Sequence, residues 1–180
     1  MNKQSGIQEK ELLSLMERFA FRNIEQSEAG QAAEIERICF PPNEACSDTS
    51  IRERIAAASE LFLVAVDKQK GKIAGFLNGI ATNEDAFRDE FFTDIRLYNP
   101  QGKNIMLLGL DVLPEYRNQG LGRELVFQYL KREKERNRET VFLTCLNAKI
   151  KMYEKFGFTD GGIANSTWGG EEWHEMRYTL

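Results

Sequence analysis

The stretch Leu107–Gly122, LLGLDVLPEYRNQGLG, decides how this chain folds. Its first part is an apolar run of the kind that forms a buried strand, and Pro114 ends that strand. A glycine-spaced turn at Gly120 and Gly122 then opens a helix, whose first turn presents free backbone N–H groups and the positive end of the helix dipole. Because glycine lets a ligand approach closely and Arg117 adds a positive charge, the turn predicts a phosphate or diphosphate site.

Two motifs in the C-terminal half of the chain carry a family resemblance. The hexapeptide RNQGLG at 117–122 lacks the Lys-Ser/Thr ending of a P-loop and the glycine spacing of the dinucleotide fingerprint. It is similar to the R/Q-x-x-G-x-G/A signature of the GNAT family of N-acetyltransferases, whose members bind acetyl-CoA at this turn. Asn147 and the segment MYEKFGF at 152–158 resemble the family's Asn…Y-x-x-x-G-F element. The resemblance implies acetyl-CoA as cosubstrate.

The apolar pattern around these motifs predicts strands that alternate with helices. We expect strands at residues 21–26, 61–66, 73–81, 105–112, 140–146, 158–164 and 172–180, and helices at residues 28–39, 50–58, 84–93, 121–137 and 148–156. The fold class is therefore α/β, with a mixed, mostly antiparallel central sheet, helices on both faces and a parallel strand pair at the cofactor cleft. The acyl-CoA N-acyltransferase fold implied by the resemblance has this order of elements.

Composition narrows the class of protein. With 180 residues and a net charge of −4, we expect one domain over residues 1–180, in which residues 1–20 form an amphipathic helix. An acidic chain is a poor partner for nucleic acid, no apolar run is long enough for a membrane span, and the first residues are too polar for a secretory signal. The three cysteines lack metal-ligand spacing. We therefore expect no metal, free thiols and a cytoplasmic location.

The resemblance implies that acetyl-CoA is held mostly by backbone groups. N–H groups from Asn118 through Arg123 would hold the pyrophosphate, and the backbone of the central strand would pair with the pantetheine arm. The residues assigned to the cofactor are Leu110, Asp111, Val112, Arg117, Asn118, Gln119, Gly120, Leu121, Gly122, Arg123, Asn147 and Tyr153. Asn147 has a second interpretation, as the N-cap of a helix that starts at Ala148.

Tyr153 is the candidate catalytic acid. It stands four residues before Gly157, and by resemblance its phenol hydrogen-bonds the cofactor sulfur and protonates the departing CoA thiolate. A thiolate leaves readily enough that a weak acid suffices. The alternative is a half-buried helix tyrosine without a chemical role.

The general base is left unassigned by the sequence. The segments FPPNEACS at 40–47 and GGEEWHEM at 169–176 look like the arylalkylamine N-acetyltransferase branch, especially its bacterial members. Vertebrate enzymes of that branch carry two histidines on the central strand, where this chain has Met106 and Leu108, and neither side chain accepts a proton. The remaining ionisable candidates are Glu36, Glu44, Asp111 and His174.

Each of these candidates has a competing interpretation. By strand alternation Asp111 faces away from Met106, Leu108 and Leu110, which argues against it as the base. Glu44 belongs to the loop expected to shape the amine pocket, and a solvated loop carboxylate explains it equally well. His174 is a lone histidine on a terminal strand, where a structural role is usual. Proton loss through ordered water would need no dedicated base.

The acceptor is expected to be a small amine. We assign Phe40, Pro41 and Glu44 to the substrate pocket, whose apolar walls would also include Phe92, Tyr98, Trp168 and Trp173, although each aromatic residue fits ordinary packing as well. The expected reaction is direct acetyl transfer to a primary amine, aryl or alkyl, without an acyl-enzyme. Three rivals remain: a CoA-binding sensor or pseudoenzyme, a protein N-terminal or lysine acetyltransferase, and an unrelated nucleotide-binding enzyme. A homodimer is compatible with the family.

Overall fold

The computed structural model describes residues 12–180, so the first part of the predicted N-terminal helix lies outside the described residues. Residues 12–18 are helical and lead directly into the first strand. The strands are β1 (Phe19–Asn23), β2 (Phe62–Asp67), β3 (Lys72–Thr82), β4 (Asn104–Val112), β5 (Thr140–Leu146), β6 (Thr159–Ile163) and β7 (Trp173–Thr179). The α-helices are α2 (Ala29–Cys39), α3 (Asp48–Ala58), α4 (Leu121–Glu135) and α5 (Ile150–Lys155). Short 3₁₀ helices occur at Gln26–Glu28, Ser59–Leu61, Asp89–Phe92, Ile95–Leu97, Pro114–Tyr116, Asn147–Lys149 and Trp168–Gly170.

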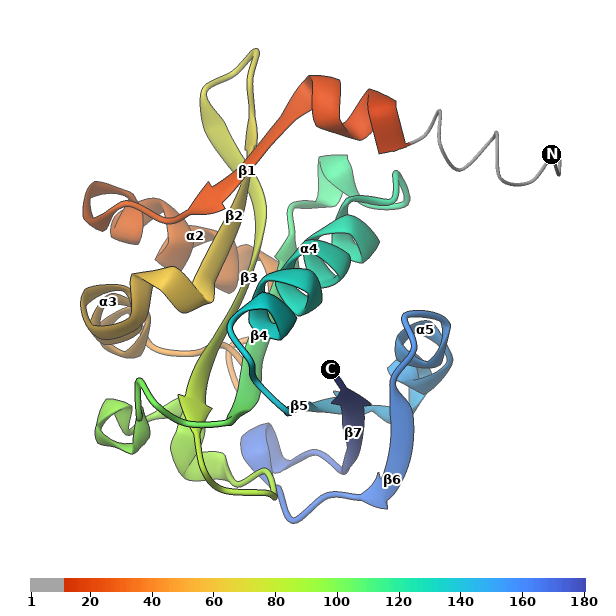
Figure 1. Cartoon of the computed structure of the whole chain (residues 1–180). Coiled ribbons are helices and arrows are strands. Elements are labelled where there is room, and N and C mark those ends of the chain that lie inside the picture. Colours follow the sequence, from red (N-terminus) through yellow and green to blue (C-terminus); the bar gives the residue numbers. More distant parts are fainter. Residues whose placement is uncertain (1–11) are drawn as a thin grey trace, which may run out of the picture.

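All of these strands belong to one sheet, in the order β1-β2-β3-β4-β5-β7-β6. Within residues 12–180 the β4–β5 pair is parallel and every other neighbouring pair is antiparallel. Helices α2 and α3 cover one face of the sheet and α4 covers the other (Figure 1). The predicted α/β class, with a mixed, mostly antiparallel sheet and a parallel pair at its centre, is confirmed. None of the described helices combines the length and apolar composition needed to cross a membrane.

Two apolar clusters hold the helices on the sheet. On the α4 side, Leu121, Leu125 and Tyr129 are buried at helical spacing against the strands. The other cluster packs α2 and α3 against the opposite face. In α3 the buried positions include Arg54 at 3% exposure, three residues after Ile51 on the same apolar face. The fold therefore buries a positive charge beside the centre of the sheet.

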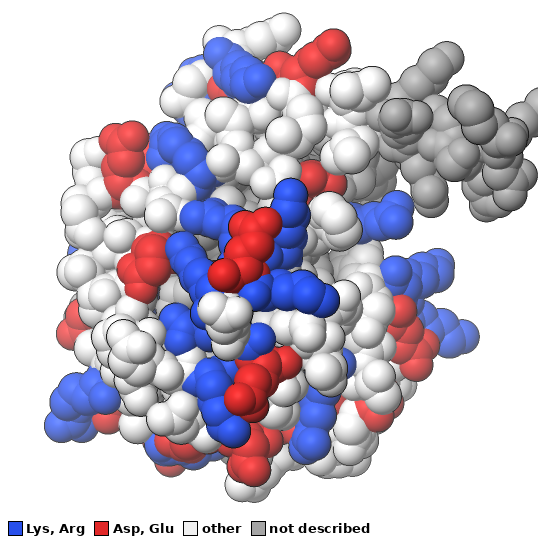
Figure 2. Space-filling view, in the orientation of Figure 1, with Lys and Arg blue, Asp and Glu red and all other residues white. Residues whose placement is uncertain are grey.

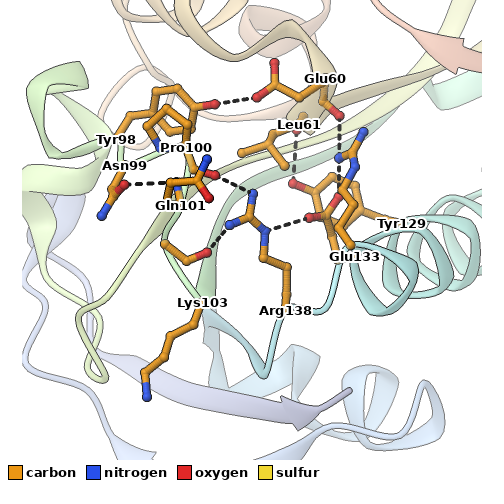
Figure 3. A network of polar contacts seen from close by, with 12 residues as sticks. Glu60, Leu61, Tyr98, Asn99, Pro100, Gln101, Lys103, Tyr129, Glu133 and Arg138 are labelled. Atoms are coloured by element: carbon orange, nitrogen blue, oxygen red, sulfur yellow. Dashed lines mark hydrogen bonds and ion pairs between the residues drawn. The ribbon is translucent and has the colours of Figure 1, made fainter.

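A network of polar contacts joins the C-terminal end of α4 to the loop that precedes β4 (Figure 3). Arg138 donates from Nη2 to the Pro100 carbonyl at 3.1 Å and from Nη1 to the Gly102 carbonyl, while its Nε lies 3.5 Å from Glu133 Oε2. Arg136 donates to Glu133 Oε1 at 2.6 Å. These contacts fix α4 against the start of β4.

The face of the molecule shown in Figure 2 carries positive and negative side chains interspersed, which fits a solvated surface.

The sheet opens between its two central strands. β4 and β5 pair only where Asn104–Met106 meets Thr140–Phe142. Beyond that point β4 stays paired with β3 as far as Val112, and β5 stays paired with β7 as far as Leu146. The facing edges of β4 and β5 therefore leave backbone N–H and C=O groups without a strand partner, and such groups need another partner when they are buried.

A β-bulge in β4 changes the face that its later side chains occupy. The register with β3 shifts after Asn78 and leaves Leu108 as an extra residue. Met106 and Leu108 are buried in the α2–α3 cluster, and Asp111 lies on the same face, where its carboxyl group meets that of Glu36 on α2. The prediction that Asp111 faces away from Met106 and Leu108 is therefore wrong, because the extra residue shifts the alternation by one position.

The predicted helix over residues 84–93 is also wrong, since only Asp89–Phe92 form a 3₁₀ turn there. The Phe87 N–H donates to Glu175 Oε2 of β7 at 2.8 Å rather than to a helical carbonyl. Phe87 also packs edge-on against Phe91, with ring centroids 5.8 Å apart. A long-range hydrogen bond and aromatic packing thus replace the helix. The other predicted elements are confirmed to within a few residues at their ends.

Candidate active site

A cavity of about 760 Å³ lies where β4 and β5 separate. The turn before α4 forms one end, and the 40–46 loop and the segment around Trp168 form the other. The residues that were assigned from the sequence and line the cavity are Phe40, Pro41, Glu44, Leu110, Val112, Arg117, Asn118, Gly120, Leu121, Gly122, Arg123 and Tyr153. Three further assigned residues, Asp111, Gln119 and Asn147, lie outside its walls. Most of the assigned residues are thus brought together around one hollow.

The end beside α4 is built from backbone. Gly120 precedes the helix in the left-handed region, with φ of +84°, and no side chain caps the helix. Asn118 is also left-handed, with φ of +59°. A Cβ on Gly122 would lie 3.6 Å from Val112 Cγ2, so glycine keeps the space between turn and strand open. The first N–H groups of α4 are therefore free to bind an anion, and the residues present fit a diphosphate group.

Gln119 points away from the cavity. Its Oε1 accepts a hydrogen bond from Arg18 Nη1 at 3.0 Å, and its Nε2 donates to the Glu115 carbonyl at 2.9 Å. The turn is thereby tied to the helical residues 12–18, and the Leu15 side chain lies close to Gly120. Any contact of Gln119 with a ligand would come from its backbone.

The end of β4 is held by two side chains. Arg117 donates from Nε to the Val112 carbonyl at 2.8 Å, and the Cys39 thiol lies 3.4 Å from the same oxygen. Burial raises the pKa of the Cys39 thiol to about 11, and burial likewise raises that of Cys145, the second cysteine in the cavity wall, to about 11. Both groups are therefore thiols rather than nucleophilic thiolates near neutral pH.

Tyr153 reaches the cavity from α5. Its ring packs edge-on against Phe156 and Phe158, with centroid distances of 6.0 and 5.8 Å. Burial raises the pKa of the phenol, followed by the nearby Cys145 and Asp111 groups. The phenol is consequently protonated at neutral pH and able to donate a proton.

Asn147 is exposed at the start of the 3₁₀ helix Asn147–Lys149. No side chain caps this turn or α5, so the interpretation of Asn147 as an N-cap before Ala148 is wrong. Its neighbours Leu146 and Lys149 line the cavity. The Asn147 side chain therefore lies beside the cavity rather than in its wall.

Aromatic side chains close the opposite end. Phe40, Phe92, Trp168 and Trp173 line the cavity there, and Trp168 stacks on Phe92 with ring centroids 4.7 Å apart. Tyr98 does not line the cavity, because its hydroxyl donates to Glu60 in the 3₁₀ helix Ser59–Leu61. The aromatic side chains at this end of the cavity therefore do not include Tyr98.

Two distant loops meet over this aromatic end. Trp168 Nε1 donates to the Glu44 carbonyl at 2.7 Å, and Asn43 Nδ2 donates to the Gly169 carbonyl at 2.9 Å. Trp173 Nε1 in turn donates to the Trp168 carbonyl at 2.8 Å. The Glu44 carboxyl group lies at the rim, where partial burial and the neighbouring Glu171 raise its pKa.

A buried polar network lies beneath the aromatic end. Glu36, at 2% exposure, lines the cavity and accepts a hydrogen bond from the Cys46 N–H at 2.8 Å. Arg54 donates to Asn78 Oδ1 at 3.1 Å and to the Phe92 carbonyl at 2.6 Å. Arg54 was not among the predicted site residues, although the sequence places it three residues after Ile51 on the apolar face of α3.

His174 contacts Asp160 rather than the cavity. Its Nδ1 lies 3.1 Å from Asp160 Oδ1 on β6, and the residue is not part of the cavity wall. Of the ionisable candidates for the base, Glu36 and Glu44 line the cavity, Asp111 contacts Glu36, and His174 serves the β6–β7 pair.

Known proteins resemble this chain in sequence and in fold. A model described as the Acetyltransferase (GNAT) family matches residues 29–158. The serotonin N-acetyltransferase of Mesocricetus auratus is 30% identical over 114 residues, which cover 62% of this chain and 53% of that protein. The chain therefore spans about half the length of that curated relative.

Solved structures share the fold at low sequence identity. The loading GNATL domain of CurA from Lyngbya majuscula has a TM-score of 0.78 at 15% identity, covering 89% of this chain and 97% of that domain. A phosphinothricin acetyltransferase from Sinorhizobium meliloti, solved in complex with acetyl-CoA, has a TM-score of 0.65 at 15% identity, covering 91% and 89%. At such identities the likeness concerns the fold alone.

Proposed function

The chain belongs to the acetyltransferase (GNAT) family, and we propose that it uses acetyl-CoA as cosubstrate and acetylates the primary amine of a small aryl- or alkylamine. The observation that carries this proposal is the aromatic end of the cavity, where Phe40, Phe92, Trp168 and Trp173 surround the space beyond the strand split. Such side chains bind an apolar substituent, and the carboxyl groups of Glu36 and Glu44 complement an ammonium group.

For the cofactor we propose the assignment expected from the motifs. The free N–H groups between Asn118 and Arg123 would hold the pyrophosphate, and the open edge of β4 at Leu110–Val112 would pair with the pantetheine arm. Asn147 would reach that arm from beside Leu146 and Lys149. Acetyl-CoA, when bound, supplies the thioester carbonyl that an amine attacks.

We further propose that transfer is direct and that Tyr153 is the catalytic acid. The thiols that line the cavity, Cys39 and Cys145, have pKa values of about 11 and are poor candidates for an acyl-enzyme. The Tyr153 phenol keeps its proton at neutral pH and would give it to the departing thiolate.

A small acceptor is favoured over a polypeptide by the way the aromatic end is closed. The hydrogen bonds from Trp168 to the Glu44 carbonyl and from Asn43 to the Gly169 carbonyl tie two loops together across it. A polypeptide substrate needs an open groove, which these ties obstruct. The Mesocricetus auratus relative is named for serotonin, an arylalkylamine, which suits the same pocket chemistry.

The test is mass-spectrometric detection of acetylated product with acetyl-CoA and a mixed panel of acceptors. The panel contains arylalkylamines, alkylamines, polyamines, aminoglycosides and lysyl peptides. Acetylation confined to aryl- or alkylamines supports the proposal, whereas acetylation of lysyl peptides alone refutes it. Binding of CoA without any acetylated product would favour the alternative hypothesis of a CoA-binding sensor or pseudoenzyme.

A further inference from the structure

Two buried carboxyl groups, one in the cavity wall and one behind it, have no part in the proposed roles of Tyr153 and of the strand backbone. Glu36 on α2 lines the cavity at 2% exposure, and Asp111 on β4 lies next to it at 0% exposure. A Cβ added to Gly109 would lie 3.5 Å from Glu36 Oε2 and 3.0 Å from Asp111 Oδ2. The glycine therefore lets both carboxyl groups approach the strand backbone, directly before the segment Leu110–Val112 assigned to the acyl donor.

Hydrogen-bond donors around this pair are scarce. The Cys46 N–H donates to Glu36 Oε1 at 2.8 Å. Glu36 Oε2 and both oxygens of Asp111 are buried and receive no hydrogen bond from any described residue. Buried carboxylate oxygens without donors are costly, and a proton held between the two groups lowers that cost, because it joins Glu36 Oε2 to one oxygen of Asp111. Protonated Asp111 then donates to Glu36.

Arg54 sets the charge of the pair. Its guanidinium, at 3% exposure, contacts neutral atoms, namely Asn78 Oδ1, the Phe92 carbonyl and, at 3.2 Å, Cys46 Sγ. No carboxylate of residues 12–180 forms an ion pair with it. A buried cation requires a nearby anion, and its field favours the ionised form of Glu36 and of Asp111. One negative charge and one proton on the pair satisfy both requirements.

We propose that Glu36 is the general base of the acetyl transfer and that protonated Asp111 is the residue that positions it. The assignment rests on the proposed function, since it requires an amine acceptor. Glu36 is in the cavity wall on the side of the β4 bulge, where Leu108 stands in place of an ionisable residue. The base is thus supplied by helix α2 instead of the central strand.

Glu36, Tyr153 and solvent together account for every proton that the reaction moves. The ionised Glu36 carboxylate takes one proton from the bound ammonium group and leaves a neutral amine. As the carbon–nitrogen bond forms and the carbon–sulfur bond breaks, the Tyr153 phenol protonates the thiolate. The second proton lost from the nitrogen restores the phenol, and Glu36 releases its proton to solvent. One proton is released per amide formed.

The surroundings make Glu36 a stronger base than a solvated carboxylate. Burial raises its pKa above the ordinary value of 4.5, and the Cys46 N–H, Arg54 and the Asp111 hydrogen bond oppose that rise. The titratable and charged groups that face the pair are Arg54 from α3, Cys46 from the loop, Cys39 from α2, Arg117 from the turn and Tyr153 from α5. Both thiols are protonated at neutral pH, with pKa values of about 11, so the arginines supply the opposing charge.

Kinetics of isosteric variants test this role. In Glu36→Gln the amide oxygen still accepts from the Cys46 N–H, so the fold is kept while the base is removed. We expect kcat/KM for the best amine of the panel to fall about 100-fold. The acidic limb of its pH profile, which is the decrease in kcat/KM at low pH caused by protonation of the base, should disappear. The affinity for CoA, measured by calorimetry, stays unchanged. Glu34→Gln, an exposed neighbour on α2, is the matched control and keeps wild-type kinetics.

Asp111 supplies a second line of evidence. Asp111→Asn keeps a donor to Glu36, so the acidic limb stays in place, whereas Asp111→Val removes the donor and moves the limb to higher pH. A purely structural Asp111 would leave the limb where it is in both variants. Independently of turnover, infrared spectroscopy of the wild type at neutral pH should show the C=O stretch of a protonated carboxyl group that Asp111→Asn lacks.

The outcomes separate the two proposals. A Glu36→Gln enzyme with the wild-type rate and acidic limb, or a wild type without the protonated-carboxyl band, overturns the role of the pair. A wild type that binds CoA and acetylates no amine refutes the proposed function, and with it the base, even where the infrared band is present.

Discussion

Trp168 donates its indole N–H to the main-chain carbonyl of Glu44 at 2.7 Å, although 124 residues separate them in the sequence. The same indole ring stacks on Phe92. One side chain therefore fixes both the loop at the rim of the aromatic end of the cavity and the aromatic wall beneath it. Substitutions of Trp168 should weaken amine binding more than they weaken cofactor binding.

Trp168→Phe tests this expectation. The variant keeps a ring for stacking and loses the N–H, which is worth about 1 kcal/mol, so we expect the KM for the amine to rise about fivefold. Trp168→Ala also loses the stacked ring and should raise it further. Steady-state kinetics at varied amine concentration give the KM, and calorimetry gives the Kd for CoA. A weaker affinity for CoA with an unchanged amine KM would contradict the assignment of this end to the acceptor.

Tyr153→Phe should lower kcat far more than CoA affinity. Loss of a general acid costs roughly 100-fold or more in rate, while the ring that packs against Phe156 and Phe158 is kept. Burial raises the phenol pKa above its ordinary value of 10, so Tyr153 stays protonated below that pH. Loss of the Tyr153 proton should therefore cause no decrease in the wild-type kcat below pH 10. Single-turnover rates and the Kd for CoA are measured in parallel. An unchanged rate removes Tyr153 from the mechanism.

Gly120→Glu should abolish CoA binding, because it places a negative charge at the proposed pyrophosphate site. Any side chain is strained at this φ of +84°, so Gly120→Gln, of the same size, is the matched control. We expect the glutamine variant to bind CoA weakly and the glutamate variant to show no binding by calorimetry. Equal affinities for both variants would show that the anion does not bind at this turn.

Arg138 contributes to stability at the far end of α4. Arg138→Ala removes the donors to the Pro100 and Gly102 carbonyls and leaves Glu133, at 1% exposure, with a poorer set of partners. Breaking a buried pair costs about 3 kcal/mol, which urea unfolding detects. Arg96→Ala breaks an exposed pair with Asp94 and should leave the free energy of unfolding nearly unchanged. Similar losses in both variants would argue against a special role for the α4 network.

Local patterns predicted the order of the elements and the turn that opens α4 well. The apolar run ended by Pro114, and the glycines at 120 and 122, determine the strand, the turn and the start of α4 from neighbouring residues alone. Features that depend on distant partners were not predictable. The helix expected over residues 84–93 yields to the Phe87–Glu175 hydrogen bond, whose acceptor lies on β7.

The aromatic end of the cavity also depends on distant partners that the sequence does not reveal, whereas the orientation of Asp111 could have been predicted. The tie between Trp168 and Glu44 has no local signal, since each residue alone fits a surface loop. The orientation of Asp111 had one: Gly109 inside an apolar strand is a typical sign of a bulge, and a bulge reverses the alternation that follows it. Arg54 likewise was visible as a charged residue on the apolar face of α3.

The buried carboxyl pair also predicts how stability depends on pH. Burial and the neighbouring Glu36 raise the pKa of Asp111 well above its ordinary value of 3.8. Between the unfolded and the folded pKa, the folded state therefore binds more protons than the unfolded state. The free energy of unfolding consequently falls as the pH rises from about 4 toward neutral, by up to about 1.4 kcal/mol per pH unit for one proton.

Asp111→Asn removes this titration, because the amide binds no proton in either state. We expect its free energy of unfolding, measured by urea titration at a series of pH values, to decline less steeply above pH 4 than that of the wild type. Asp94→Asn is the control of opposite sign: Arg96 lowers the pKa of Asp94, so its contribution is lost as the pH falls instead. A wild type and an Asp111→Asn variant with the same slope would mean that Asp111 is ionised in the folded protein, and Glu36 would then lack the protonated partner that the proposal gives it.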